Sequence, residues 1–378
     1  MGDEPGCTSH HHRLHRGESR IGRRLAGAEP PRSSFTFVEE LKAPDGLAEW
    51  MSKQGLGDGP LENVSAITGG TQNIMLRFTR SGRPYVLRRG PKHLRPRSNV
   101  VIMRETRVLA ALAGTDVPHP RLIASCDDPG VLGDAVFYLM EPIDGFNAGQ
   151  ELPELHAADP AVRFEMGLSM ADALAKLGAV DYTAVGLSDY GKPEGFLERQ
   201  VPRWLSELES YQDFENYPGP DIPGVDDVAA WLEEGRPTAW TPGIMHGDYH
   251  AANVMFSRTG PEVVAIVDWE MSTIGDPLLD LGWLLATWGQ SAAFGGALFE
   301  KGGLAAPGDL VERYARNTTR DLSHVTWYTV LACFKLGIVL EGTNARASAG
   351  KAPQEVGDLL HEATVRLFEQ ALTLMESA

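Results

Sequence analysis

The chain has 378 residues, 43% of them apolar, and its formal net charge is −17. That apolar fraction allows a sizeable core in one large domain or two smaller ones. The negative charge argues against a general affinity for nucleic acid or anionic membranes, and it suits cationic ligands. We therefore expect a soluble globular protein without nucleic-acid or membrane partners, whose oligomeric state the sequence does not indicate.

The cysteines and the first residues of the chain bear on its compartment. Cys7, Cys126 and Cys333 lie far apart without a C-x-x-C pair, so neither a disulfide framework nor a thiolate metal site is indicated. This pattern favours a reducing, cytoplasmic compartment. Residues 1–34 lack the apolar segment of a signal peptide and are rich in Gly, Arg, His and Pro, which predicts a disordered N-terminal extension.

The first part of the chain predicts a small antiparallel sheet. A short helix is expected between Asp45, a capping residue, and Gly55, a left-handed stop. Short β-rich segments follow between Gly-containing turns, and Ser98 can cap one longer helix. The predicted strands cover residues 63–68, 73–79, 84–89, 122–125 and 135–140. We therefore predict an α+β N-terminal lobe, residues 35–140, with one main helix against its sheet.

Helical patterns dominate residues 141–378, which we predict to form a larger, mainly helical C-terminal lobe. Two short strands, 253–256 and 263–267, are the exception, and the turn "SRTG" joins them. The apolar run Val325–Leu340 contains Lys335 and is too short and too polar for a membrane span, so it predicts a buried helix. The predicted helices cover residues 162–177, 194–208, 225–234, 278–288, 310–317, 324–340 and 353–374.

Residues 245–270, "MHGDYHAANVMFSRTGPEVVAIVDWE", concentrate functional side chains. Asp248 and Asn253 are five residues apart, and Asp268 ends an apolar strand. This spacing is that of a kinase catalytic loop and its metal-binding Asp. A carboxylate can orient a hydroxyl and take its proton, and Mg²⁺ binds hard oxygen ligands. We therefore predict Asp248 as the catalytic base, with Asn253 and Asp268 as magnesium ligands.

His246 opens the same loop. We expect it to hydrogen-bond the loop backbone, because a second general base would compete with Asp248. A plainer interpretation remains open for the other residues: Asp248 and Asn253 are also ordinary turn residues, and Asp268 can simply end a strand.

Three motifs carry a family resemblance: "HGDYHAANVMF", "VAIVDWEMSTIGDPLLDLGWLL" and "GGTQN". They resemble the aminoglycoside phosphotransferase and choline kinase family, whose bilobal fold is that of eukaryotic protein kinases, over about residues 60–375. The resemblance implies that Asp248 is the base, that Asn253 and Asp268 hold Mg²⁺, and that ATP, or GTP in some relatives, is the donor. It also implies that Asp280 braces the catalytic loop.

The nucleotide side of the site is less clearly marked. In "TGGTQN", residues 68–73, glycine N–H groups can approach phosphates closely, although two adjacent glycines alone more often mark a hairpin turn. The resemblance favours a turn that covers the nucleotide, formed by Gly69, Gly70, Thr71 and Asn73. It also implies that the backbone at Met140, Glu141 and Ile143 contacts the adenine.

Arg88 stands where a kinase places the Lys of its third strand, and this departs from the general pattern. Glu105 is the only acidic residue between Arg77 and Arg107, so it is the natural partner of Arg88. An arginine can still engage phosphate oxygens with two hydrogen bonds. The alternative is that Arg88 and Arg89 are exposed charges at the end of a strand.

Two charged segments give opposite indications of the acceptor. Between Trp204 and Arg236 there are nine acidic residues and no Lys or Arg, which suits either an aminoglycoside or a solvated surface. Residues 77–107 carry ten basic residues and one acid, which suits a phosphate-bearing ligand such as coenzyme A or keeps a sheet edge soluble. "YVLRRGP" is similar to the phosphotransferase-like domains fused to acyl-CoA dehydrogenases, which adds hydroxyacyl-CoA as a candidate.

The sequence therefore predicts an ATP- and Mg-dependent phosphotransferase that acts on a hydroxyl of a small molecule. The acceptor is an aminoglycoside, an amino alcohol or a hydroxyacyl-CoA. The alternative is a catalytically silent nucleotide-binding module of the same fold, which the substitution at Arg88 favours. A protein kinase is disfavoured because no "APE"-like segment follows Asp268.

Overall fold

The computed structural model describes residues 45–67, 73–290 and 292–378, all of which belong to one compact unit. The predicted N-terminal extension and three predicted nucleotide-binding residues lie outside the described residues; these three are Gly69, Gly70 and Thr71. The proposed division into lobes at residue 140 is a boundary within the compact unit and stays a prediction.

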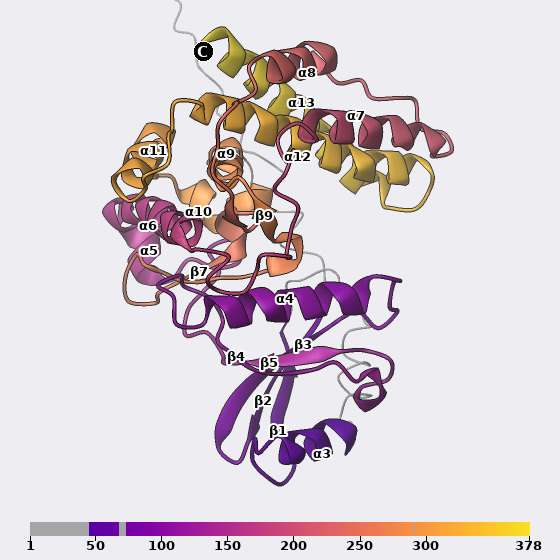
Figure 1. Ribbon diagram of the computed structural model, residues 1–378, viewed down its shortest axis with the longest axis vertical. Helices are drawn as coiled ribbons and strands as arrows, with labels where there is room; N and C mark the ends of the chain where they lie inside the picture. Colours follow the sequence, from indigo (N-terminus) through magenta and orange to yellow (C-terminus); the bar gives the residue numbers. More distant parts are fainter. Residues whose placement is uncertain (1–44, 68–72, 291) are drawn as a thin grey trace, which may run out of the picture. The chain divides into compact units, whose positions relative to one another are not determined.

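A five-stranded antiparallel sheet forms the first part of the described chain, and a short helix, α3, precedes it (Figure 1). Its order is β1-β2-β3-β5-β4, so each strand pairs with a near neighbour in the sequence except at the β3–β5 step. Apolar side chains alternate with polar ones along β2, as expected for a strand that is covered on one face. The bounds are α3 Asp45–Lys53, β1 Glu62–Ala66, β2 Ile74–Arg80, β3 Arg83–Arg89, β4 Leu122–Cys126 and β5 Phe137–Met140.

One helix, α4 (Ser98–Leu112), packs on this sheet with Val108, Leu109 and Leu112 buried. The prediction that Ser98 caps it is wrong. Ser98 is already the first helical residue, and its Oγ accepts a hydrogen bond from the N–H of Arg95, 2.9 Å away. The hydroxyl therefore fixes the incoming loop instead of the first turn of the helix.

The rest of the chain is mainly helical, as predicted. The helix α12 is its centre and packs against α13, α9, α7 and α8. Two helices were not predicted: α5 is too short to show a period, and α10 has a non-helical residue at Gly296 (φ 46°). The bounds are α5 Glu154–Ala158, α6 Pro160–Ala179, α7 Gln200–Ser210, α8 Val225–Glu234, α9 Leu278–Thr287, α10 Ala292–Lys301, α11 Pro307–Arg316, α12 Val325–Ser348 and α13 Gln354–Glu376.

The apolar helix α12 has the length and composition of a membrane span, yet 78% of its most apolar window is buried inside the protein. Burial of that extent is what a core helix shows. The helix extends beyond the predicted end at Leu340, and Gly342 and Ala345 in this extension are buried.

Two small two-stranded sheets connect the helices to the functional loop. The predicted pair is present as β7 (Val254–Phe256) and β8 (Val263–Ile266). A second pair, β6 (Gly243–Met245) and β9 (Thr273–Gly275), was not predicted, because three residues are too few to show an alternating pattern. The chain leaves β6 into the loop that leads to β7, so both sheets anchor the segment predicted to be catalytic.

Candidate active site

The helix α9 fixes the loop between β6 and β7 through hydrogen bonds to its backbone. Asp280, in the first turn of α9, accepts hydrogen bonds from the backbone N–H of His246 (2.6 Å) and of Gly247 (2.9 Å). It is fully buried, and burial raises the pKa of its carboxyl. Two backbone donors on one carboxylate fix the direction in which the loop leaves its strand.

His246 ties the loop to the strand that precedes Asp268. Its ring is buried, its Nδ1 accepts from the N–H of Asp248 (3.3 Å), and its Nε2 lies 2.9 Å from the carbonyl oxygen of Val267. Because a carbonyl oxygen only accepts, this pairing requires the tautomer with hydrogen on Nε2. The ring thus holds the backbone on both sides and has no nitrogen left for another partner.

Asp248 and Asn253 lie side by side at the end of this loop. The amide nitrogen of Asn253 donates to the backbone oxygen and to Oδ2 of Asp248, at 2.9 Å each. The indole N–H of Trp283 donates to Oδ1 at 3.1 Å, and Nε2 of His250 lies 3.5 Å from the same atom. The side chain of Asp248 is nevertheless 35% exposed, so its carboxylate is held in place while remaining accessible.

These contacts also set the charge of Asp248. Burial raises the pKa of its carboxyl, but interactions with His250, His246 and Lys335 outweigh burial and lower the pKa to about 2. Asp248 is therefore a carboxylate throughout the neutral range.

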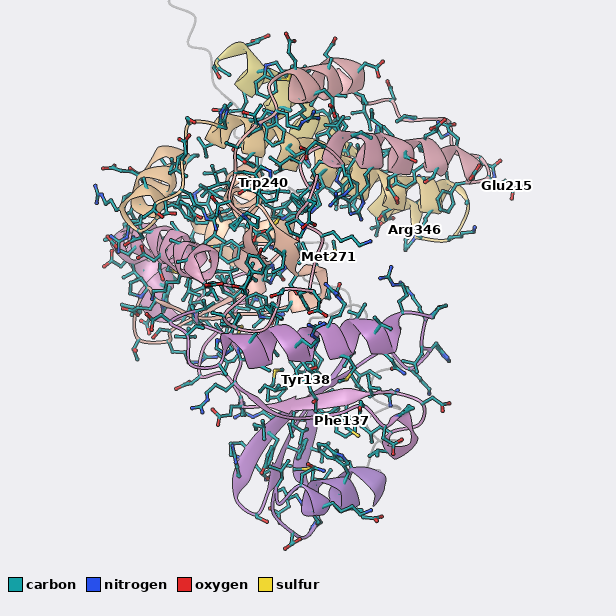
Figure 2. All side chains as sticks on the ribbon, viewed as in Figure 1. Phe137, Tyr138, Glu215, Trp240, Met271 and Arg346 are labelled. Carbon is teal, nitrogen blue, oxygen red and sulfur yellow. The ribbon has the colours of Figure 1, made fainter. Side chains whose placement is uncertain are left out.

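Asp268 follows β8 in a left-handed backbone conformation (φ 66°). Its Oδ1 accepts from Arg88 at 2.7 Å, while Arg88 also contacts Glu105 through its Nε, at 2.8 Å from Oε2. Tyr138 on β5, labelled beneath α4 in Figure 2, donates to the same oxygen of Glu105 at 2.7 Å. Burial acts to lower the pKa of Arg88, but Glu105, Tyr138 and Asp268 together outweigh burial and raise this pKa.

The interpretation of Arg88 and Arg89 as exposed strand-end charges is wrong. Both side chains are buried, and Arg89 donates to the carbonyl oxygen of Leu132 at 2.9 Å. Arg88 instead joins the sheet, α4 and the segment after β8 through one guanidinium group.

Of the predicted nucleotide residues, Asn73 is brought to the same region: its amide nitrogen lies 3.4 Å from Oε2 of Glu270. Glu270 was assigned no role in the sequence, although it stands two residues after Asp268 in the "VDWE" motif. Burial raises the pKa of Glu270, and its carboxylate lies within 4.8 Å of those of Glu105 and Asp268.

The predicted adenine contacts at Met140, Glu141 and Ile143 stay a prediction. Met140 ends β5 and is buried, while Ile143 lies three residues farther on. The backbone N–H of Glu141 already donates to the carbonyl oxygen of Arg121 at 2.9 Å, so it is not free to bind a base. The side chain of Glu141 pairs with Arg83 at 3.3 Å.

The two charged segments differ in how far their side chains are exposed. All nine acidic side chains between Trp204 and Arg236 are exposed, and Figure 2 shows Glu215 at the outer end of the helical region. In residues 77–107, three arginines are buried within the fold, and two others bind backbone or a neighbouring carboxylate. These five are Arg80, Arg88, Arg89, Arg104 and Arg107.

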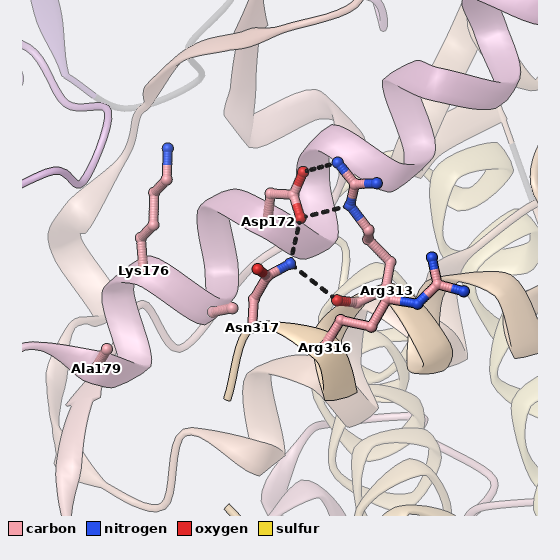
Figure 3. A pocket seen from close by; sticks show the side chains of 7 residues that line it. Asp172, Lys176, Ala179, Arg313, Arg316 and Asn317 are labelled. Carbon is pink, nitrogen blue, oxygen red and sulfur yellow. Dashed lines mark hydrogen bonds and ion pairs between the residues drawn. The ribbon is translucent and has the colours of Figure 1, made fainter. Parts of the chain in front are cut away.

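A separate pocket of about 440 Å³ lies between α6 and α11 and contains none of the predicted site residues (Figure 3). Its carboxylate, Asp172, is bound by two nitrogens of Arg313, each at 2.7 Å, and by Asn317 at 2.8 Å. The donors around Asp172 are thus engaged with the protein itself.

This chain is similar to known proteins in sequence and in fold. The sequence profile of the phosphotransferase enzyme family matches residues 63–314. Acyl-CoA dehydrogenase family member 11 of Gallus gallus is 29% identical over 328 residues, which are 82% of this chain and 40% of that protein. Family member 10 of Mus musculus is 27% identical over 83% of this chain and 29% of its own length. The chain therefore spans less than half of the length of these relatives.

Solved structures share the fold. A "putative aminoglycoside phosphotransferase" from Ralstonia eutropha superposes with a TM-score of 0.70 at 29% identity, covering 88% of this chain and 98% of that one. An APH(4)-Ia variant in complex with ADP and hygromycin B gives 0.54 at 14% identity, covering 84% and 98%. The predicted α+β, protein-kinase-like fold is confirmed.

Proposed function

Because the chain belongs to the phosphotransferase enzyme family, we propose that it transfers the γ-phosphoryl group of ATP to a hydroxyl group of a small molecule with the help of Mg²⁺. The observation that carries the proposal is that Asn253 bonds the side chain of Asp248 at 2.9 Å, while its backbone carbonyl oxygen accepts from the N–H of Val267, the residue before Asp268, also at 2.9 Å. GTP is the alternative donor.

The oxygen atoms of this convergence fit a magnesium ion. The amide nitrogen of Asn253 donates to Asp248 and also lies 3.2 Å from Nε2 of His250, whereas Oδ1 of Asn253 has no hydrogen-bond partner among the described residues. Arg88 occupies Oδ1 of Asp268 and leaves Oδ2, on a side chain that is 40% exposed. One amide and one carboxylate oxygen suffice for Mg²⁺, which retains several waters. When bound, the ion would neutralise charge on the nucleotide phosphates.

In this proposal Asp248 accepts a hydrogen bond from the hydroxyl group of the acceptor. The hydroxyl oxygen attacks the γ-phosphorus, the bond from that phosphorus to the bridging oxygen of ADP breaks, and the hydroxyl proton passes to Asp248. A carboxylate with a pKa of about 2 is a weak base, so it orients the hydroxyl and takes the proton late. Arg88 holds Asp268 and stands close enough to the site to contact phosphate oxygens.

The acceptor remains one of three classes: a hydroxyacyl-CoA, an aminoglycoside or an amino alcohol. The names of the curated relatives, acyl-CoA dehydrogenase family members, favour the hydroxyacyl-CoA. The buried ammonium of Lys335, which acts on Asp248, also disfavours a cationic acceptor at that point. The predicted cytoplasmic location is proposed on the same footing, and two free, buried cysteines, Cys126 and Cys333, are compatible with it.

A side-by-side screen of ATP consumption tests the proposal. Wild-type protein is supplied with hydroxyacyl-CoAs, aminoglycosides, amino alcohols and sugars, with Mg²⁺ or with a chelator. We expect consumption with one class, abolished by the chelator and by Asp268→Asn. Binding of ATP without consumption in any arm would instead support the silent nucleotide-binding module.

A further inference from the structure

Lys335 is a charged residue in the middle of α12, where it is only 7% exposed. Its Nζ lies 4.5 Å from the ring centre of Trp283 and 5.6 Å from that of Trp204. The same atom donates to the backbone oxygen of Gly247 at 3.4 Å. A buried ammonium with one long hydrogen bond is unfavourable for the fold, so its position calls for a reason other than stability.

The Gly247 peptide links Lys335 to the catalytic loop. Its N–H donates to Asp280 on α9 at 2.9 Å, and its oxygen accepts from Lys335 on α12. Gly247 has a φ of 87°, and a Cβ there would lie 2.5 Å from the backbone oxygen of Met271. The residue before Asp248 is therefore a glycine by necessity, and two different helices hold it from both sides.

Trp283 provides a second link between Lys335 and the loop. The face of its indole ring carries the ammonium, and its N–H donates to Oδ1 of Asp248 at 3.1 Å. A cation over an indole face favours one orientation of the ring. The charge of Lys335 thus acts on Asp248 through the peptide before it and through the ring that binds its carboxylate.

We infer that Lys335 is a positioning residue of the phosphotransfer site, which fixes the Gly247 peptide and the Trp283 ring and thereby aims the carboxylate of Asp248. The inference rests on the proposed function for its effect on turnover. The effect on the loop itself is independent of any reaction.

Lys335 should lose its charge within a pH range that experiments can easily reach. The charged groups that act on it are Asp280 on α9, Asp248 in the loop and Arg203 on α7. Burial lowers the pKa of Lys335 to about 8 from an ordinary value of 10.5, although Asp280 and Asp248 oppose it. Between these values the unfolded chain binds more protons than the folded one, so loss of the charge with rising pH stabilises the fold.

The direction of this stability change distinguishes a positioning role of Lys335 from a purely structural role. As the pH rises through about 8, Lys335 should add to stability while the loop loses its hold on the Gly247 oxygen and turnover declines. In Lys335→Met, which removes the charge at similar length, neither change with pH should occur. A purely structural lysine would show no opposition between stability and turnover.

The experiment compares wild type with Lys335→Met, Lys335→Arg and a control, Thr329→Val, which changes a buried α12 hydroxyl that bonds within its own helix. Hydrogen exchange is measured for the peptide that contains residues 245–253, together with the melting temperature and ATP turnover. We expect Lys335→Met to melt no lower than wild type, to exchange its loop amides about tenfold faster and to turn over about tenfold more slowly. Lys335→Arg keeps the charge, so its loop protection should stay nearer the wild-type value.

Each outcome decides the inference. Unchanged loop exchange in Lys335→Met would overturn it, and so would an equal rise in exchange over all helices with a lower melting temperature. If wild-type protein consumes no ATP with any acceptor, the proposed function fails, whereas the exchange of the loop still decides the role of Lys335. Thr329→Val should match the wild type in loop exchange.

Discussion

Two polar networks of this protein differ in how far their central carboxylates are exposed to solvent. In the helical part, Glu341 on α12 is 0% exposed and accepts hydrogen bonds from Tyr217 (2.7 Å), Asn344 (2.9 Å) and His361 (2.7 Å). In the candidate active site, Asp248 accepts hydrogen bonds from Asn253 and Trp283, and Asp268 accepts one from Arg88, yet 35% and 40% of their side chains are exposed.

The difference shows what each network serves. A carboxylate whose partners all come from the protein stabilises the packing of α12 against α13 and has nothing left to bind a ligand. A carboxylate that is oriented by several donors but open on one side is prepared for a partner that arrives from solution. Partial exposure therefore distinguishes Asp248 and Asp268, for which we propose a function, from the structural Glu341.

The largest expected effect comes from a change in the candidate active site. Asp248→Asn keeps the shape of the side chain and removes its charge, so the acceptor hydroxyl loses its base. We expect kcat to fall by roughly 10²–10⁴-fold, with the affinity for ATP nearly unchanged. Steady-state kinetics and nucleotide titration check this, and an unchanged kcat would contradict the role of Asp248.

Replacement of Arg88 disturbs both the site and the fold. Arg88→Met leaves Glu105 buried without its cation, so we expect the free energy of unfolding to fall by about 3–5 kcal/mol. Arg88→Lys retains a charge but cannot bind Glu105 and Asp268 with the same planar fork, so a smaller loss is expected. Chemical denaturation of both variants measures the order, and equal losses would argue against the bridging role.

A change in the network around Glu341 should affect stability alone. Glu341→Gln replaces one accepting oxygen by a donor among three donors, so we expect a loss of about 1–3 kcal/mol in unfolding free energy. ATP turnover by the folded fraction should not change. A drop in turnover comparable to that of Asp248→Asn would remove the distinction between the networks.

The smallest effect is expected at the pocket between α6 and α11. Asp172→Asn weakens a partly exposed pair with Arg313, which should lower the unfolding free energy by about 1 kcal/mol or less. Neither nucleotide affinity nor turnover should respond. A marked change in either would show that this pocket takes part in function.

Much of this arrangement could be predicted from the sequence where a local pattern exists. The meander, the main helices and the hairpin of β7 and β8 follow from periodicity and turn residues. The spacing of Asp248, Asn253 and Asp268 predicted that they would meet, because a loop and the end of a strand deliver them to one place. Glu105 was predicted as the partner of Arg88 from charge alone.

What could not be predicted depends on contacts between distant segments. Strands β6 and β9 have three residues each and no pattern. The hydrogen bond from the N–H of Glu141 to the carbonyl oxygen of Arg121, which engages one backbone donor among the predicted adenine contacts, depends on strand register. Lys335 was visible as a lone charge in an apolar run, but its position behind Gly247 depends on how α12 packs against α9.

The central claim is that Asn253 and Asp268 hold a divalent cation with the nucleotide beside Asp248. Calorimetric titration of wild type and Asp268→Asn with a non-hydrolysable ATP analogue, with and without Mg²⁺, tests it most directly. We expect Mg²⁺ to tighten binding to the wild type by about tenfold or more and to have little effect on the variant. Equal affinity of the wild type with and without Mg²⁺ would contradict it.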